Sequence, residues 1–379
     1  MPFDYELLRL IWWALLGALL IGFAVMDGFD LGVATLLPFV ARSDGERRIV
    51  INTVGPVWEG NQVWLVLGAG AIFAAWPALY AAAFSGFYLA MFVVLCALIL
   101  RPVGFKFRSK IHDKRWRSFW DWALFAGGFV PALIFGVAVG NALQGAPFRF
   151  DDELRMTYEG SFLGLLNPFA LFCGFVSVIM LIMHGGCYLA LKSDEPVASR
   201  AAFAARQAAF ILIVAMIVGG VCMELGVNTY RIVGAIDTSG PSNPLLKAVE
   251  VRLGGVSANY ARHLWMLAAP AAALAGAAIA GTLTIYRRDG AAFVASAISV
   301  AGVVATAGVS LFPFLLPSSL APDQSLTVWD ASSSELTLGI MLVAVVIFLP
   351  IIVAYTAWAY RVLRGRVTLA AIRSDTSSY

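Results

Sequence analysis

Residues 8–40 read LRLIWWALLGALLIGFAVMDGFDLGVATLLPFV, an apolar run whose only charged side chains are Arg9, Asp27 and Asp30. About 20 apolar residues are enough for a helix to cross the hydrocarbon core of a bilayer. This run is longer and would measure about 50 Å as a helix, at a rise of 1.5 Å per residue. We therefore expect a membrane helix that is tilted, bent or projecting beyond the lipid.

The composition of the whole chain supports a membrane protein. Of its 379 residues, 60% are hydrophobic and 13% are charged, whereas soluble domains have about 45–50% apolar and about 25% charged residues. The net charge is only +3, and the basic residues lie between apolar runs. This pattern argues against a nucleic-acid partner, which requires clustered basic residues on an outward face.

Apolar runs long enough to span a bilayer occur nine times, and none has the alternation of a barrel strand. The sequence therefore predicts an all-α polytopic transmembrane bundle of about nine spans, forming a single integral-membrane domain over residues 1–379. The predicted spans are 8–40, 48–74, 78–100, 119–141, 162–190, 203–226, 264–286, 291–316 and 335–361.

The basic residues predict the orientation of these spans, because cytoplasmic segments are enriched in Lys and Arg. With the N-terminus outside, the inner segments hold 19 of the 26 basic residues, Arg373 among them, and the outer segments hold seven. The two largest loops, 142–161 and 227–263, then lie outside. The C-terminus lies inside, as an odd number of spans requires.

Three acidic residues lie within predicted spans, where an ionisable group costs roughly 2.5–3.5 kcal/mol on insertion scales. Asp27 and Asp30 are three residues apart and share one helix face. Glu59 lies in GPVWEGNQVWL with Asn61 and Gln62, at a depth similar to that of Asp30. The acids could converge on one polar site and relay protons, or each could simply accept hydrogen bonds from neighbouring helices.

Other polar residues have two interpretations each. Arg101 ends the third span and could reach the inner headgroups or pair with Asp30 inside the bundle. His184 is within the fifth span; a hydrogen-bonded structural role is favoured over haem ligation, because no second axial group is evident. Asp121 lies near a span end, where interfacial solvation would account for it. The four cysteines lie in apolar runs and predict neither disulfides nor a metal site.

Several long motifs resemble subunit II of the cytochrome bd ubiquinol oxidases. They include DYELLRLIWWALLGALLIGFAVMDGFDLG, GPVWEGNQVWL, RPVGFKFRSK, LFPFLLPSS and SLTVWDASSSELTL. The resemblance runs from residue 4 to about 366. The nine spans and the inner C-terminus expected above are also what that family has.

The resemblance implies a multi-pass protein of the bacterial plasma membrane, in a complex that oxidises quinol and reduces oxygen to water. It implies that subunit I carries haem b and haem d, and that this chain holds no haem and no catalytic residue of its own. Subunit I would be its partner, with a very small third subunit beside the pair in some members. Some members also hold a quinone in a structural role.

The resemblance also assigns roles to individual residues. The acid of the PxWxGNxVW motif, here Glu59, is associated with a proton path at the subunit interface. The family often has Asp there, so the side chain is one methylene longer. Asp30 and Arg101 match important family positions, and Trp64 matches the entrance of a proposed oxygen channel. Trp58, inside the second span, is expected to line a cavity or an interface.

Without the resemblance, a secondary transporter or proton channel with acids at the midplane would be the first interpretation. The chain lacks paired inverted repeats and clearly broken helices at matching positions, which weakens that alternative. A purely structural scaffold for a haem subunit is a third possibility. It differs from the oxidase interpretation only in whether Glu59 and Asp30 handle protons.

Overall fold

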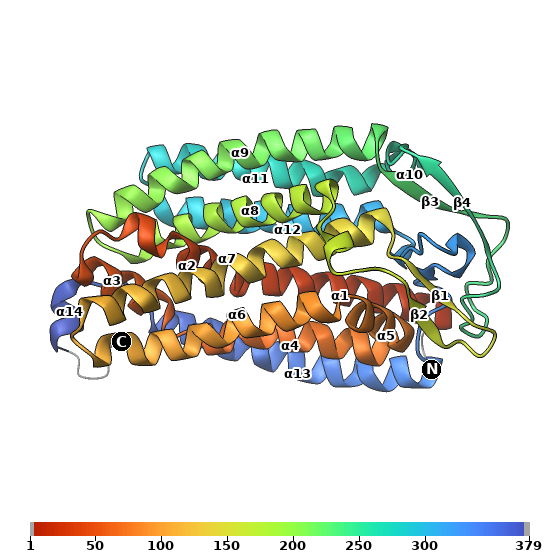
Figure 1. Ribbon diagram of the computed structural model, residues 1–379, viewed down its shortest axis with the longest axis horizontal. Coiled ribbons are helices and arrows are strands. Elements are labelled where there is room, and N and C mark those ends of the chain that lie inside the picture. The colour runs from red at the N-terminus through yellow and green to blue at the C-terminus, as the bar shows by residue number, and fades with distance from the viewer. Residues whose placement is uncertain (1–3, 375–379) are drawn as a thin grey trace.

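The computed structural model describes the backbone of residues 4–374 and the side chains of residues 4–372, so the side chain of Arg373 lies outside the described part. Long helices run side by side along one axis (Figure 1). They are α1 Tyr5–Met26, α2 Gly28–Val40, α4 Trp58–Ala75, α6 Tyr88–Phe107, α7 Lys114–Gln144, α8 Pro168–Lys192, α9 Val197–Leu225, α11 Ala268–Ile285, α12 Asp289–Leu311 and α13 Glu335–Val362.

Shorter elements lie at the two ends of the bundle (Figure 1). At one end are α3 Asp44–Val54 and α14 Leu369–Ser374; at the other are α5 Pro77–Gly86, α10 Ser257–Arg262 and three antiparallel hairpins. The hairpins pair β1 Phe148–Phe150 with β2 Met156–Tyr158, β3 Asn228–Val233 with β4 Ala248–Leu253, and β5 Phe314–Leu316 with β6 Leu326–Thr327. The membrane-spanning part is helical as predicted, but the chain is not purely α.

Eight segments of the described residues are long and apolar enough to cross a membrane, and the first of them is Tyr5–Val40. The predicted second span, 48–74, is divided into α3 and α4 by a turn at residues 55–57. Pro56 favours this interruption because it cannot donate a helical hydrogen bond. The predicted third span, 78–100, is also wrong in its bounds, since α5 ends at Gly86 and the spanning helix α6 begins at Tyr88.

Helices α2, α7 and α8 contact one another pairwise and pack closely through small residues. A Cβ atom added to Gly32 would lie 1.9 Å from the carbonyl oxygen of Leu181, and one added to Gly185 would lie 2.6 Å from the backbone of Gly32. Only glycine allows the two backbones to approach so closely, as is common between membrane helices. This packing fixes α2, and with it Asp30, against its neighbours.

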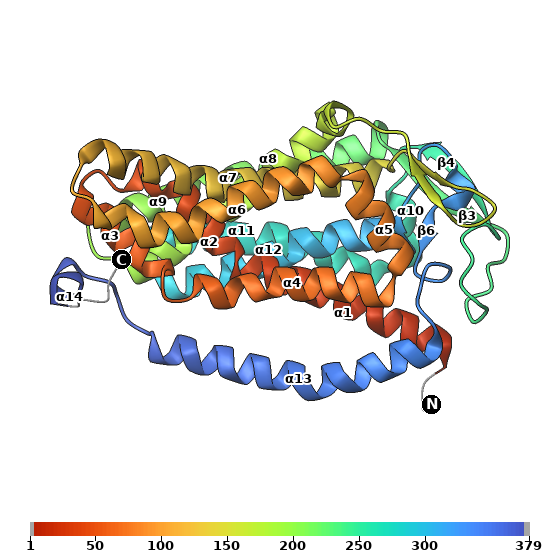
Figure 2. The same ribbon diagram turned by 60° about the horizontal axis from the view of Figure 1, so that its bottom comes forward.

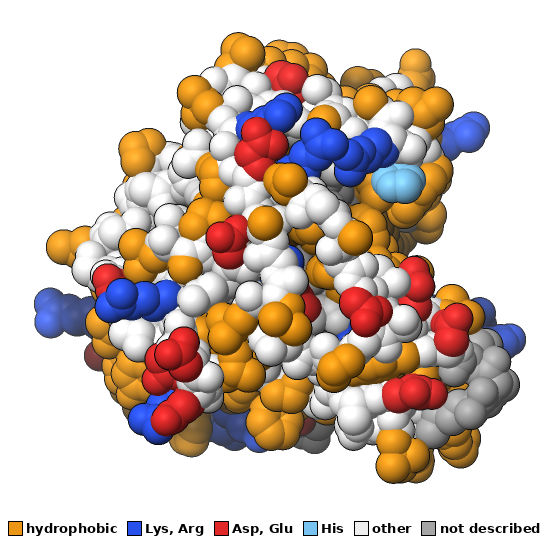
Figure 3. Space-filling view, turned by 90° about the vertical axis from the view of Figure 1, so that its right-hand side faces the viewer, with side chains coloured by type: hydrophobic (Ala, Val, Ile, Leu, Met, Phe, Trp, Pro, Cys, Tyr) orange, Lys and Arg blue, Asp and Glu red, His pale blue; other side chains and the backbone are white. Residues whose placement is uncertain are grey.

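The hairpin end of the bundle is tied to α1 by the buried side chain of Arg9. Its guanidinium donates to Ser332 Oγ at 2.8 Å, to the carbonyl of Thr238 at 2.6 Å and to that of Gly240 at 2.9 Å. On the outer face of this end, acidic and basic side chains are interspersed (Figure 3). That mixture fits the end predicted to be outside, because outer segments of membrane proteins carry no excess of Lys and Arg.

Helix α13 stands apart from the rest of the bundle (Figure 2). Only Leu338 and Gly339 of this helix are buried. At its first turns, Trp12 Nε1 donates to the carbonyl of Leu338 at 3.0 Å, and near its other end Tyr360 contacts α4. Most of the apolar surface of α13 is therefore free to contact lipid or another subunit.

Candidate functional site

The two acids of the first predicted span lie where that helix is interrupted. α1 ends at Met26 and α2 begins at Gly28, with Asp27 between them. The side chains of Asp27 and Asp30 are both buried. They lie on the same face, as their spacing predicts, and both approach Arg101 of α6.

Arg101 pairs with these acids inside the bundle, and its side chain is buried. Its Nη2 atom is 2.8 Å from Asp27 Oδ1 and its Nη1 atom is 3.2 Å from Asp27 Oδ2, so the pair is bidentate. The distance from Nη2 to Asp30 Oδ2 is 3.8 Å. Of the two alternatives that the sequence leaves open for Arg101, the structure has the pairing inside the bundle, with Asp27 as the primary partner and Asp30 as the more distant carboxylate.

Asp30 is connected to two further helices through Asn61. The side-chain amide of Asn61 donates to Asp30 Oδ2 at 2.8 Å, and the Tyr360 hydroxyl donates to Asn61 Oδ1 at 2.7 Å. This chain of hydrogen bonds runs from α2 through α4 to α13. We call Asp27, Asp30, Asn61, Arg101 and Tyr360 the polar cluster.

Three buried polar atoms at the polar cluster have no hydrogen-bond partner among the described residues: Asp30 Oδ1, Arg101 Nε and the indole nitrogen of Trp58. Trp58 is buried, and its ring centroid is 5.9 Å from the Arg101 guanidinium carbon. Buried polar groups in native proteins are nearly always satisfied, by protein or by ordered water. The cluster therefore has hydrogen-bonding capacity for water or for groups from outside this chain.

Glu59 does not join Asp30, although the sequence suggested that the two could converge. It is exposed in the first turn of α4, while Asn61 is buried and meets Asp30. Residues two apart on a helix are about 200° apart around its axis, so Glu59 and Asn61 point in nearly opposite directions. Glu59 therefore lies close to Asn61 along the axis of α4 but on the opposite side of the helix.

The tryptophan at the end of the same motif packs on the first helix. A Cβ atom added to Gly22 of α1 would lie 2.6 Å from a ring carbon of Trp64, so the indole ring covers that glycine. Trp64 is half-buried. Its ring therefore lies between α1 and α4, two helices that pack against each other.

His184 is buried, and both of its ring nitrogens already have partners. Nδ1 is 2.8 Å from Ser296 Oγ, and Nε2 is 2.9 Å from the carbonyl oxygen of Val25. A haem ligand needs a free ring nitrogen directed at the iron. This geometry fits the hydrogen-bonded structural role that the sequence favoured, and it does not fit an axial ligand.

A second charged network lies at the end of the bundle that carries α3 and α14, which we call the arginine-rich end (Figure 1). It includes Asp121, and the expectation that interfacial solvation accounts for this residue is wrong. Asp121 is buried and pairs with Arg108 at 2.5 Å and with Arg47 at 2.6 Å. Asp44 at the start of α3 pairs with Arg108 at 2.9 Å and with Arg117 of α7 at 2.8 Å. These ion pairs bind the short helix α3 to α6 and α7.

Tyr360 was missed by sequence reasoning because it lies in α13, far along the chain from the acids. An aromatic residue near a span end is usually explained by the interfacial belt. No local pattern in the sequence distinguishes a tyrosine whose hydroxyl reaches another helix. Its contact with Asn61 depends on the position of α13 against α4, which is a tertiary feature.

Comparisons with known proteins agree on one family. Residues 8–363 match the family model described as cytochrome bd terminal oxidase subunit II. The chain is 50% identical to a probable cytochrome oxidase subunit 2 of Haemophilus influenzae over 96% of both chains. It is 48% identical to the cytochrome bd-I ubiquinol oxidase subunit 2 of Escherichia coli K12 over 99% of both chains.

A more distant relative and a solved structure extend this agreement. The chain is 30% identical to the cytochrome bd ubiquinol oxidase subunit 2 of Bacillus subtilis, over 94% of this chain and 96% of the relative. A chain of the bd oxidase from Geobacillus thermodenitrificans has the same fold, with a TM-score of 0.68 at 18% identity, covering 94% of this chain and 98% of that one. The chain belongs to the cytochrome bd terminal oxidase subunit II family.

Proposed function

We propose that this chain is the haem-free subunit of a quinol-oxidising, oxygen-reducing complex in the bacterial plasma membrane, and that its partner is a haem-bearing subunit I. Family membership and the names of the close relatives support the complex. The histidines support the lack of haem. Both nitrogens of His184 are engaged, His112 lies beside Arg117 in an exposed segment, and His263 is exposed at the hairpin end.

The proposed topology has nine passes, with the N-terminus outside and the C-terminus inside. The eight apolar segments would be joined by α4, which runs alongside α1 (Figures 1 and 2). α4 is less apolar because its first turns carry Glu59, Asn61 and Gln62. Arginines gather at the end with α3 and α14, the side that the positive-inside rule assigns to the cytoplasm.

We propose that the polar cluster holds a proton that moves during turnover. Two buried carboxylates, Asp27 and Asp30, face one guanidinium. Burying an uncompensated charge is expensive, so the cluster is electrically neutral only when it binds one further proton. Asp27 is engaged by both guanidinium nitrogens, whereas Asp30 Oδ1 has no partner among the described residues. That free oxygen is the observation that carries the proposal, because it is the atom most able to bind the proton.

In this scheme Glu59 passes protons between the surface of this chain and the cluster. Its exposed carboxylate points away from Asn61 and would meet subunit I or water, so water or a group of subunit I would have to complete the path to Asp30. Trp64, at the contact of α1 and α4, would border the oxygen route. The exposed faces of α4 and α13 would contact subunit I. A small third subunit and a structural quinone would also have to be accommodated on surfaces of this kind.

Glu59→Gln in the purified two-subunit complex tests the proton role, with Glu335→Gln as the matched control. Both glutamates are exposed in the first turn of a long helix. We expect Glu59→Gln to lower quinol-driven oxygen consumption with normal haem content, and Glu335→Gln to leave it unchanged. Unchanged turnover in a fully assembled Glu59→Gln complex would refute the proton role.

The haem assignment has a separate test. The complex should show haem b and haem d absorbance in reduced-minus-oxidised spectra, and this chain purified alone should show none. A chain that binds haem alone would overturn the proposed division between the subunits.

A further inference from the structure

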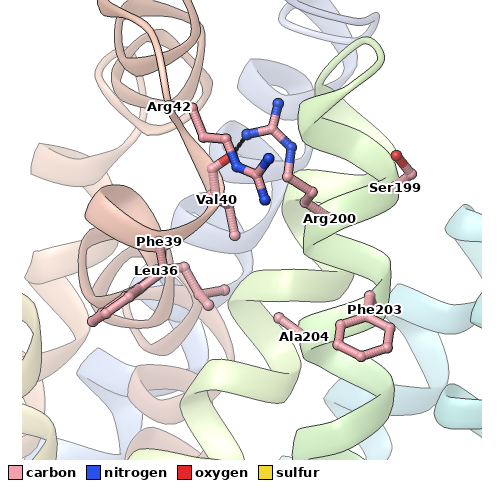
Figure 4. A pocket seen from close by; sticks show the side chains of 8 residues that line it. All are labelled: Leu36, Phe39, Val40, Arg42, Ser199, Arg200, Phe203 and Ala204. Carbon is pink, nitrogen blue, oxygen red and sulfur yellow. Dashed lines mark hydrogen bonds between the residues drawn. The ribbon is translucent and has the colours of Figure 1, made fainter.

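A groove of about 370 Å³ lies between α2 and α9 at the arginine-rich end of the bundle. Its apolar lining includes Leu36, Phe39 and Phe203, and the residues Phe39 and Phe203 are 62% and 56% exposed. Arg42 and Arg200 line the same groove. Their guanidinium groups lie next to each other at one end of it, with Leu36 and Phe203 farther along (Figure 4).

The two guanidinium groups differ in their partners. Arg200 donates to the carbonyl of Val40 at 2.5 Å and pairs with both carboxylate oxygens of Glu46 at 3.0 Å. Arg42 is exposed, and its guanidinium makes no hydrogen bond or ion pair with any described residue. Arg42 is therefore a free cation at the mouth of the groove.

A third arginine approaches from α9. The guanidinium carbon of Arg206 is 5.2 Å from the centroid of the Phe203 ring, which lines the groove. Side chains on a helix lean toward its N-terminus, so Arg206 leans toward the end where Arg200 lies. Its guanidinium has no acidic partner among the described residues.

The charges around the groove do not cancel. Glu46 is the one carboxylate that pairs with a groove arginine among the described residues, and it neutralises Arg200. Glu195 is also near, since it accepts from the backbone nitrogen of Ser199 at 3.2 Å, but it is paired with Arg287 at 2.5 Å. Arg42 and Arg206 remain as excess positive charge beside an exposed apolar surface.

We propose that this groove binds a single phospholipid with a net negative headgroup, from the leaflet at the arginine-rich end. The phosphate would lie at the mouth against Arg42, with Arg206 adding positive charge beside Phe203, and an acyl chain would pass along Leu36 and Phe203. Basic pockets between membrane helices bind anionic headgroups in this way. Inorganic phosphate would leave the exposed phenyl rings uncovered, and a lipid without net charge would not use the two unpaired arginines.

The test is native mass spectrometry of the delipidated two-subunit complex with added dioleoyl phosphatidylglycerol. We expect Arg42→Gln/Arg206→Gln to weaken its binding about 30-fold, since each basic residue near the surface contributes a factor of roughly five. Arg115→Gln/Arg364→Gln is the control, because it removes two exposed arginines at the same end, outside the groove. Equal weakening in both double variants, or none in the groove variant, would overturn the proposal.

Two further measurements identify the occupant. Dioleoyl phosphatidylcholine has the same acyl chains and should bind much more weakly; equal binding overturns the role of the arginines. Inorganic phosphate at millimolar concentration should not displace the lipid; displacement would show a simple anion site and overturn the lipid assignment.

Photo-crosslinking provides a readout that does not depend on the variants. A phosphatidylglycerol with a photoreactive acyl chain should label peptides containing residues 36–42 and 199–206. A second groove, between α11 and α12, is lined by Ala272, Gly276, Ile279, Val294 and Ile298 among others and has no charged lining residue. Labelling of that groove equal to labelling of the arginine groove would refute a specific site.

Discussion

Replacing Arg101 with glutamine removes the only cation that contacts the buried acids of the polar cluster among the described residues. Asp27 then loses a pair with N–O distances of 2.8 and 3.2 Å, and Asp30 loses a cation at 3.8 Å. Removing one partner of a buried ion pair typically costs about 3–5 kcal/mol, because the other charge stays buried and uncompensated. Total stabilities of folded domains are about 5–15 kcal/mol, so the loss should be large.

The assay is thermal unfolding of the purified complex in detergent, followed by loss of the monodisperse peak in size-exclusion chromatography. We expect Arg101→Gln to lower the Tm by several degrees. The matched control is Lys106→Gln, an exposed basic residue on the same helix, which should change stability by no more than about 0.5 kcal/mol.

The double variant Asp27→Asn/Arg101→Gln separates charge from packing. If uncompensated charge causes the loss, neutralising Asp27 should restore part of the Tm, giving a coupling energy of about 0.5–3 kcal/mol. An Arg101→Gln complex that melts with the Lys106→Gln control, or a double variant whose loss equals the sum of the single losses, would refute this reasoning.

Three further predictions follow from single contacts. Tyr360→Phe removes the 2.7 Å hydrogen bond to Asn61. The loss should lower the free energy of unfolding by about 1 kcal/mol, measured as a small fall in Tm. If the hydrogen-bond chain carries protons, turnover should also fall. Gly32→Ala should abolish assembly, seen as loss of the complex in membranes, because its Cβ would lie 1.9 Å from the carbonyl oxygen of Leu181; normal yield would contradict the packing. The pKa of Glu46 lies below its usual value, chiefly because the Arg200 side chain hydrogen-bonds to it. Ionised Glu46 therefore stabilises the fold at pH values above its usual pKa, and this stabilisation is lost as the pH falls through the lowered pKa. Glu46→Gln should flatten the acid side of a plot of Tm against pH.

The spanning helices were predictable because the bilayer allows little choice. Every backbone polar group must be satisfied within the segment, so a long apolar run is almost always a helix. The run at 335–361 agrees with α13, Glu335–Val362, to within one residue at each end. The shared face of Asp27 and Asp30 was also predictable, since it depends only on helical periodicity.

The interrupted segments were harder to predict from the sequence. Residues 48–74 contain a break at 55–57, and the residue that meets Asp30 depends on how α4 rotates after it. That rotation is set by tertiary packing, such as Trp64 on Gly22. Sequence periodicity therefore located the polar region but selected Glu59 for the contact that Asn61 makes.

The same break gives the polar cluster its electrostatic setting. α4 begins at Trp58 without a side-chain cap, so its uncapped backbone N–H groups and the positive end of its dipole lie in the same helix turn as Asn61, whose amide contacts Asp30. A continuous helix over 48–74 would have its N-terminus about ten residues away and could not supply this partial charge. The cluster therefore sets two carboxylates against one full cation, Arg101, and the partial positive charge of a helix start, a weaker compensation than a second arginine would give, so one further proton is still needed for neutrality. An acid held under such conditions can gain or lose a proton with little structural change, because the closer pair of Arg101 with Asp27 stays in place and only the 3.8 Å contact of Arg101 with Asp30 is affected.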